Sequence, residues 1–224
     1  MAAARPTDAT PGPVPAGVGL HGLVVDFGGV LTTSVRDAVV AFAEVQDVDP
    51  AQIMSVLASA YAGDAEAGDV GALETGTLPL EDFERSLSAR LRTRNGDPLD
   101  AEGLVARMFS FLSIDDGMVA AVRRLHDRGV HTALLSNTWG VEHAMREEIL
   151  ELFDTIVLSG EVGLRKPNPE IYAVALARLG LRGAECAFVD DFEINVVAAK
   201  RAGLRAILHV RTQETIRQLE ELFG

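Results

Sequence analysis

Five short apolar runs, which hardly alternate with polar residues, restrict this chain to a small number of folds. The runs are Gly22–Asp26, His131–Ser136, Thr155–Ser159, Cys186–Asp190 and Arg205–Val210. A strand that is buried on both faces is almost continuously apolar, whereas a half-exposed strand alternates. Helical patterns long enough for a crossover between parallel strands lie between the later runs, for example at Met118–Asp127 and Pro169–Leu179. We therefore expect an α/β fold in which an open parallel sheet carries helices on both faces.

Residues 36–114 break this rhythm, because they show helical periodicity and no strand pattern. A glycine-rich, acidic stretch at Gly63–Gly71 interrupts them. Since the segment lies between the first and second strands, it could cover the active edge of the sheet. We expect an all-helical cap over residues 36–114, inserted into an α/β core that comprises residues 19–35 and 115–224.

Composition excludes several classes of partner. The formal net charge of −13 makes nucleic acids and anionic membrane surfaces poor partners, and a phosphate ester would need local cations. The single cysteine, Cys186, rules out an internal disulfide and suits a reducing cytoplasm. No apolar run reaches the roughly 18 residues of a membrane span. Residues 1–18, rich in Ala, Pro, Gly and Thr, are expected to form a disordered tail, and we expect a cytoplasmic protein.

Polar residues follow four of the predicted strands at the point where each strand ends. Ligands of an open α/β sheet bind beyond the carboxyl ends of its strands, so these residues are the first candidates for a site. Directly at or after a strand lie Asp26, the pair Ser136 and Asn137, and the pair Asp190 and Asp191, while the third strand leads on to Lys166.

Most of these residues also have a structural explanation. Taken singly, Asp26 could cap a turn, Ser136 could cap a turn or a helix, and Lys166 could be a solvated charge. The pair Asp190–Asp191 differs, because adjacent carboxylates at the end of a buried strand repel one another unless a cation lies between them. A second pair, Asp115–Asp116, precedes a helical run and is interpreted as an N-cap without a catalytic role.

The order and placement of these groups resemble the four motifs of the haloacid dehalogenase-like hydrolase superfamily, whose members are mostly phosphatases. The resemblance covers nearly all of the chain from Gly22 onward, and its most specific parts are Gly163–Tyr172 and Val189–Asp191. The helical insert is similar to the helical cap of the superfamily's small-molecule phosphatases. The resemblance implies a Rossmann-like core and Mg²⁺-dependent hydrolysis of a small phosphorylated metabolite.

It also implies roles for single residues. Asp26 would attack phosphorus and form an aspartyl-phosphate that water later hydrolyses. Ser136 would donate a hydrogen bond to the phosphoryl group, and Lys166 would neutralise that group and the nucleophile. Asn137 and the backbone N–H groups after Asp26 would help to hold the phosphate.

Mg²⁺ prefers oxygen ligands, and the resemblance places them on Asp26, on the backbone carbonyl of Gly28, and on either member of the pair Asp190–Asp191. Thr32 lies where the chain enters the cap, so it is a candidate contact to substrate. Trp139, the only tryptophan, could line the substrate pocket or pack against the cap.

One position departs from the family pattern. Most phosphatases of this superfamily carry a second Asp, a general acid and base, two residues after the nucleophile, and here that residue is Gly28. A positioned acid typically contributes about 10²–10⁴-fold, so its loss handicaps a poor leaving group. The enzyme could prefer leaving groups that need little protonation, as in sugar 1-phosphates, acyl phosphates or aryl phosphates. A cap residue such as Glu74 could instead supply the proton, or the chain could bind phosphate without turnover.

Two further alternatives to a phosphatase stay open at this stage. The first is a phosphate-binding regulatory or scaffold module that lost turnover with the second Asp. The second is a metal-free haloacid dehalogenase in which Asp26 attacks carbon, although the Asp190–Asp191 pair suits a metal. The sequence indicates neither the substrate nor the oligomeric state.

Overall fold

The structure is a computed structural model that describes residues 19–59, 68–140 and 147–224. The expected disordered tail, residues 1–18, lies outside the described residues, as does most of the acidic stretch at Gly63–Gly71.

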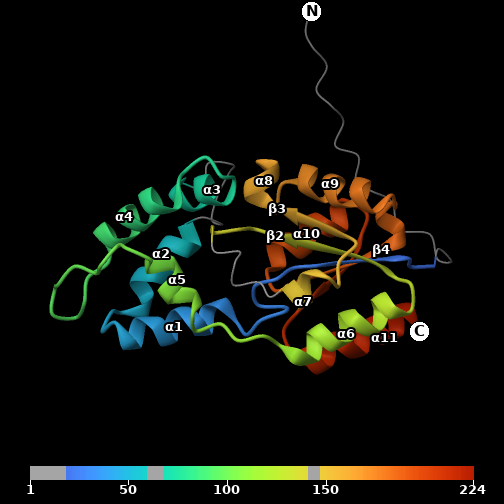
Figure 1. Cartoon of the computed structure of the whole chain (residues 1–224), viewed down its shortest axis with the longest axis horizontal. Helices are drawn as coiled ribbons and strands as arrows, with labels where there is room; N and C mark the ends of the chain where they lie inside the picture. The colour runs from blue at the N-terminus through green and yellow to red at the C-terminus, as the bar shows by residue number, and fades with distance from the viewer. Residues whose placement is uncertain (1–18, 60–67, 141–146) are drawn as a thin grey trace, which may run out of the picture.

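A five-stranded sheet forms the centre of the core (Figure 1). Its order is β3-β2-β1-β4-β5, and every neighbouring pair is parallel. The strands are β1 (Gly22–Val25), β2 (His131–Ser136), β3 (Thr155–Leu158), β4 (Cys186–Asp190) and β5 (Arg205–Leu208). The expected open parallel sheet is therefore confirmed. β1 is the middle strand, which places Asp26 between the ends of β2 and β4.

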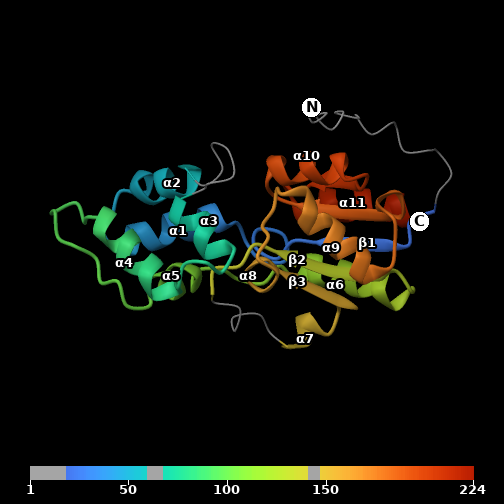
Figure 2. The ribbon, with the colours of Figure 1, turned by 90° about the horizontal axis from the view of Figure 1, so that it is seen from above.

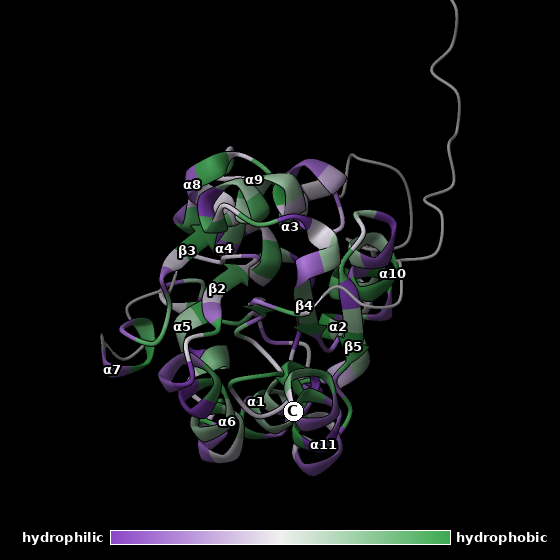
Figure 3. Cartoon of the chain, turned by 90° about the vertical axis from the view of Figure 1, so that its right-hand side faces the viewer, coloured by the Kyte–Doolittle hydropathy of each residue, from purple (hydrophilic) through white to green (hydrophobic). Residues whose placement is uncertain are grey.

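Two pairs of helices cover the two faces of this sheet. On one face α6 (Asp116–Asp127) and α11 (Thr212–Phe223) pack together, and on the other lie α9 (Pro169–Leu179) and α10 (Glu193–Arg201). Successive β1 residues enter different clusters: Leu23 packs with the α6 side and Val24 with the α9 side. This two-sided burial explains why the strand sequences do not alternate. Figure 3 shows apolar strands between helices whose outer faces are hydrophilic.

Five helices between β1 and β2 gather at one end of the molecule, beside the sheet (Figures 1 and 2). They are α1 (Val35–Val45), α2 (Pro50–Ser59), α3 (Gly68–Glu74), α4 (Leu80–Arg90) and α5 (Leu104–Phe109). Their buried side chains, among them Phe42 and Phe83, form a hydrophobic cluster of their own. In the described part of this segment, extended pairing is limited to isolated bridges such as Val48 with Thr93.

Two neighbouring crossings join these helices to the core. Thr32 and Ile114 form an antiparallel bridge, and the Thr33 amide donates to the Ser113 carbonyl at 2.8 Å. The chain thus leaves and re-enters the core side by side. Just beyond, the Asp115 side chain accepts from the Met118 amide at 2.9 Å, so Asp115 is the N-cap that the sequence indicated.

Short elements complete the core: α7 (Glu147–Leu150), α8 (Ser159–Val162) and the 3₁₀ turn η2 (Gly183–Glu185). Cys186 is fully buried in β4, as a small core residue. None of the described helices is both long enough and apolar enough to cross a membrane.

Replacement of Phe188 in β4 tests the packing of the sheet against its helices. Its ring is fully buried and meets Tyr172 edge-on at 5.5 Å. Phe188→Ala should lower the free energy of unfolding by about 3–5 kcal/mol, because it removes a large buried ring and leaves a cavity. Val45→Ala, at a residue that is 67% exposed, should change it by less than about 0.5 kcal/mol. Urea unfolding followed by circular dichroism measures both, and equal effects would contradict this packing.

Candidate active site

A buried ammonium group lies at the centre of the site. Lys166 Nζ is 2.7 Å from Asp26 Oδ1 and 2.7 Å from Asp190 Oδ2, and the lysine is only 1% exposed. The carboxylates follow β1 and end β4, whereas the lysine comes from the loop before α9. Burial alone would lower the pKa of Lys166, but the charges of Asp190 and Asp26 outweigh it and raise that pKa above its ordinary value. Lys166 therefore stays charged between two carboxylates.

Asp190 is held by a set of donors on α10 and the loop before it. Its Oδ1 accepts from the Phe192 amide at 2.8 Å and from Asn195 Nδ2 at 3.0 Å. The Tyr172 hydroxyl in turn donates to the Asn195 carbonyl at 3.0 Å. These hydrogen bonds fix the Asp190 carboxylate, which in turn orients the Lys166 ammonium. Asn195 is not among the predicted site residues, and its only signal in the sequence is an amide side chain one helical turn after the aspartate pair.

Asp191 differs from its neighbour, because its Oδ1 is buried and has no hydrogen-bond partner among the described residues. Its carboxylate also lies against the turn after β1. A Cβ on Gly29 would come 2.2 Å from Asp191 Oδ2, and Gly29 has a φ of +74°. Only glycine allows this close approach.

Asp26, Asp190 and Asp191 each offer an oxygen within 4.8 Å of the others. Burial and the other two carboxylates raise the pKa of Asp191 to about 8. Burial is also the main cause that raises the pKa of Asp26 to about 7, although Lys166 opposes it. Buried carboxylates that lie this close repel one another unless a cation lies between them. The Asp191 oxygen, which has no partner among the described residues, is available as a ligand for that cation. The donor set, all hard oxygen, fits Mg²⁺.

Asn137 fixes the loop that carries Lys166. Its Oδ1 accepts from the Lys166 amide at 2.8 Å, and its Nδ2 donates to the Lys166 carbonyl at 3.0 Å. Ser136, at the end of β2, is 5% exposed, and its hydroxyl has only a long contact of 3.5 Å to the Asn137 carbonyl. The Ser136 hydroxyl is thus the less committed of the two side chains, and Asn137 serves at least to position Lys166.

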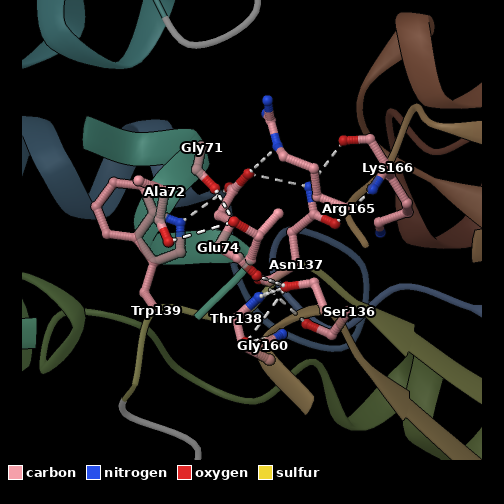
Figure 4. Close-up of polar contacts among 12 residues, drawn as sticks. Gly71, Ala72, Glu74, Ser136, Asn137, Thr138, Trp139, Gly160, Arg165 and Lys166 are labelled. Carbon is pink, nitrogen blue, oxygen red and sulfur yellow. Dashed lines mark hydrogen bonds and ion pairs between the residues drawn. The ribbon is translucent and has the colours of Figure 1, made fainter. Parts of the chain in front are cut away.

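Glu74, at the end of α3, lies in the interface between the helical segment and the core (Figure 4). It is fully buried; Oε2 accepts from Arg165 Nε at 2.6 Å and from Asn137 Nδ2 at 3.3 Å, and Oε1 accepts from Trp139 Nε1 at 3.0 Å. Its carbonyl also accepts from the Ser159 hydroxyl. Donors occupy both carboxylate oxygens, which argues against Glu74 as the proton donor for a leaving group. It instead links the helical segment to the loop that precedes Lys166.

A cavity of about 610 Å³ brings most of the predicted residues together. Its described lining includes the predicted residues Asp26, Gly28, Thr32, Ser136, Asn137, Trp139, Lys166 and Asp191, while Asp190 lies behind Lys166 and does not line it. Trp139 lines the cavity, and its ring also packs on Phe83 and Phe109 of the helical segment. The Thr32 hydroxyl accepts from the Gly29 amide at 3.0 Å and so braces the turn after β1.

Comparison with known proteins places this arrangement among hydrolases. The family described as haloacid dehalogenase-like hydrolase matches residues 20–203. Bifunctional epoxide hydrolase 2 of Rattus norvegicus is 32% identical over 119 residues, which are 50% of this chain and 22% of that protein. The sesquiterpene phosphatase astK of Aspergillus oryzae is 34% identical over 113 residues, 49% of this chain and 58% of that protein. The match thus spans about a fifth of the first relative and little more than half of the second.

A similar fold is found in a solved structure of a HAD family enzyme from Bacteroides thetaiotaomicron in complex with magnesium and inorganic phosphate. Its TM-score is 0.65 at 22% identity, and the match covers 86% of this chain and 95% of that one. At this identity the likeness concerns the fold.

The buried ion pair of Glu74 gives a direct test of the interface. Glu74→Gln keeps the shape but removes the charge opposite Arg165, whose side chain is 13% exposed. Breaking a buried pair typically costs about 3–5 kcal/mol, so we expect a loss of a few kcal/mol in the free energy of unfolding. Glu214→Gln breaks a surface pair with Arg217 and should cost less than about 1 kcal/mol. Equal losses in urea unfolding would show that the Glu74 pair does not hold the interface.

Proposed function

The chain belongs to the haloacid dehalogenase-like hydrolases, and on that premise we propose that it is a Mg²⁺-dependent phosphatase of a small phosphate monoester. The observation that carries the proposal is the buried Lys166 ammonium between Asp26 and Asp190, on the lining of a cavity. A permanent positive charge beside a carboxylate nucleophile suits an attack on an anionic phosphoryl group. We further propose that the helical segment, residues 36–114, acts as a cap over this cavity.

In the proposed first step an Asp26 carboxylate oxygen attacks phosphorus, and the bond from phosphorus to the ester oxygen breaks. The oxygen of the leaving group departs with the electron pair of that bond and takes up a proton from water. Water then attacks the phosphorus of the aspartyl-phosphate, which releases inorganic phosphate and restores the carboxylate. The covalent intermediate divides one difficult displacement into two easier ones.

The remaining residues orient the reacting groups and stabilise the negative charge at the site. Lys166 neutralises the nucleophile before attack and the phosphoryl oxygens during it, and Asp190 holds the ammonium in place. The Ser136 hydroxyl is free to donate to a phosphoryl oxygen, since its contact to the Asn137 carbonyl is long. Asn137 holds the Lys166 backbone at both its amide and its carbonyl, so the geometry of the site exists before substrate binds.

Asp26, Asp191 and the Gly28 carbonyl are the proposed Mg²⁺ ligands. Between the two aspartates of the pair, Asp191 is favoured because its Oδ1 has no partner among the described residues, whereas the Asp190 oxygens accept from Lys166, Phe192 and Asn195. When bound, Mg²⁺ supplies positive charge against the phosphoryl oxygens. Asp190 would then stay outside the direct ligand set.

The relatives support this assignment to phosphate ester hydrolysis. One relative is named a sesquiterpene phosphatase, and the HAD family enzyme of similar fold was solved with magnesium and inorganic phosphate. In this chain Gly28 stands where an acid would assist the leaving group, and Glu74 is committed to Arg165 and Trp139. We therefore propose a preference for esters whose alcohol needs little protonation.

The nucleophile can be tested by turnover. With Mg²⁺ the wild type should hydrolyse 4-nitrophenyl phosphate, and either Asp26→Asn or a chelator should lower kcat at least about 10³-fold, because the covalent route is lost. Asp116→Asn, at an exposed carboxylate on α6, is the matched control and should leave turnover unchanged. Turnover that survives Asp26→Asn would contradict the covalent route. Halide release from 2-chloropropionate in the presence of chelator would indicate a dehalogenase instead.

The missing acid can be restored. A Cβ at Gly28 would lie 3.2 Å from Val35 Cγ2, so Gly28→Asp should be combined with Val35→Ala, and Val35→Ala alone is the control. The added carboxyl should raise kcat/KM for an alkyl phosphate by about tenfold or more, with little change for 4-nitrophenyl phosphate, whose alcohol leaves without help. The effect is measured by plotting log kcat/KM against the pKa of the leaving group. The plot for the variant that carries Gly28→Asp should have a flatter slope than the plot for the Val35→Ala control. An unchanged slope would remove Gly28 as the cause of the preference.

A further inference from the structure

The cavity walls indicate which phosphate esters fit. Resting on the proposed phosphatase function, we propose that the natural substrate is a phosphate monoester of an apolar alcohol, aromatic or hydrocarbon, and not a sugar phosphate. The phosphate would occupy the end at Asp26 and Lys166, and the apolar group would extend between the helical segment and the core.

Apolar side chains from two elements of the helical segment line the cavity, whereas the nucleophile belongs to the core. Met54 and Leu57 come from α2, and Met108 and Phe109 come from α5, with Leu112 just after it. All of these except the fully buried Met108 are partly exposed, so they have surface available for a ligand. A site that selects a polyhydroxylated ligand needs several uncommitted polar groups along this wall instead.

The polar side chains beyond the phosphate end are mostly committed to protein partners. The Thr32 hydroxyl accepts from the Gly29 amide and donates to the Thr33 carbonyl at 2.9 Å. The Thr138 hydroxyl accepts from the Gly160 amide at 3.1 Å, and Glu74 binds Arg165 and Trp139.

Among the described lining residues this leaves Arg36 and Ser113, both exposed, and the buried Oδ1 of Asn195, which has no hydrogen-bond partner in the described part of the chain, to meet a polar leaving group. A sugar bound here would give up the hydration of its hydroxyl groups for few new hydrogen bonds, which disfavours binding. An apolar group would gain from burial in the same space.

The aromatic members of this class also agree with Gly28. A phenol is a more acidic alcohol than a sugar hydroxyl, so an aryl oxygen can depart without a protein acid. The walls and the missing acid are separate features of the chain, one in α2 and α5 and the other in the turn after β1. The walls favour an apolar ester, aromatic or hydrocarbon, over a sugar ester, and the missing acid favours the aromatic one.

Binding of non-hydrolysable alkylphosphonates tests the walls without turnover. Ethyl-, butyl-, hexyl- and octylphosphonate should bind the wild type with Mg²⁺ progressively more tightly than inorganic phosphate. Each buried methylene should strengthen binding by up to about fourfold until the cavity is filled. Isothermal titration calorimetry measures the series. Affinities that stay within about twofold of inorganic phosphate along the whole series would overturn the proposal.

A variant of the wall serves as a second measurement. Leu57→Gln should lower the affinity for octylphosphonate several-fold and leave the affinity for inorganic phosphate unchanged. The reason is that only the long alkyl chain is expected to reach α2. Val45→Gln, a similar change at a residue that is 67% exposed and outside the cavity, should alter neither affinity. If Leu57→Gln lowers the affinity for octylphosphonate and for inorganic phosphate to the same degree, Leu57 does not contact the alkyl chain and the proposal is contradicted.

Turnover separates this inference from the proposed function. Hexyl phosphate and glucose 6-phosphate are both esters of primary alcohols, and kcat/KM should be at least about tenfold higher for hexyl phosphate. A preference for glucose 6-phosphate, lost in Asp26→Asn, would refute the apolar class while supporting the phosphatase. If no ester is hydrolysed but the phosphonate affinities rise with chain length, the apolar site stands and the phosphatase function fails.

Discussion

The ammonium of Lys166, buried between Asp26 and Asp190, is the interaction on which the site depends. An ammonium that is 1% exposed is stable only where carboxylates replace its lost water. Those carboxylates come from neighbouring parallel strands, so the sheet order β2-β1-β4 must form before the charge can be buried. Asn137 from the end of β2 then fixes the lysine backbone. The site therefore depends on the folded sheet.

The same crowding of carboxylates explains why the site should need a cation. One lysine faces three aspartates in a chain that already carries a formal charge of −13. The pKa values of Asp26 and Asp191 lie near 7 and 8, chiefly because burial disfavours their charged forms. A divalent cation would offset that cost and would also reduce the repulsion of an anionic substrate. A metal site would thus be useful in a chain of this net charge.

The helical segment contributes in two chemically different ways. At its edge, Glu74 forms a buried ion pair with Arg165, the residue before Lys166, and so links α3 to the catalytic loop. Over the cavity, α2 and α5 present apolar side chains. The Glu74–Arg165 ion pair fixes the position of the segment. The apolar wall would select a leaving group by the apolar surface that it buries. Under the proposed function, the one segment would both hold the site and select its ligand.

The sequence by itself determined the parallel sheet and the N-cap at Asp115, and it predicted that Asp26 and Asp190 lie at one edge of that sheet. It could do so because continuous apolar runs encode two-sided burial, and because parallel strands bring their carboxyl ends to one edge. Only the tertiary structure decided that Glu74 pairs with Arg165 and that Asn195 holds Asp190. It also showed that one Asp191 oxygen has no hydrogen-bond partner among the described residues. These depend on distances of a few ångströms between residues up to 91 positions apart. Periodicity and motif spacing record which face a residue takes, but they carry no measure of such distances.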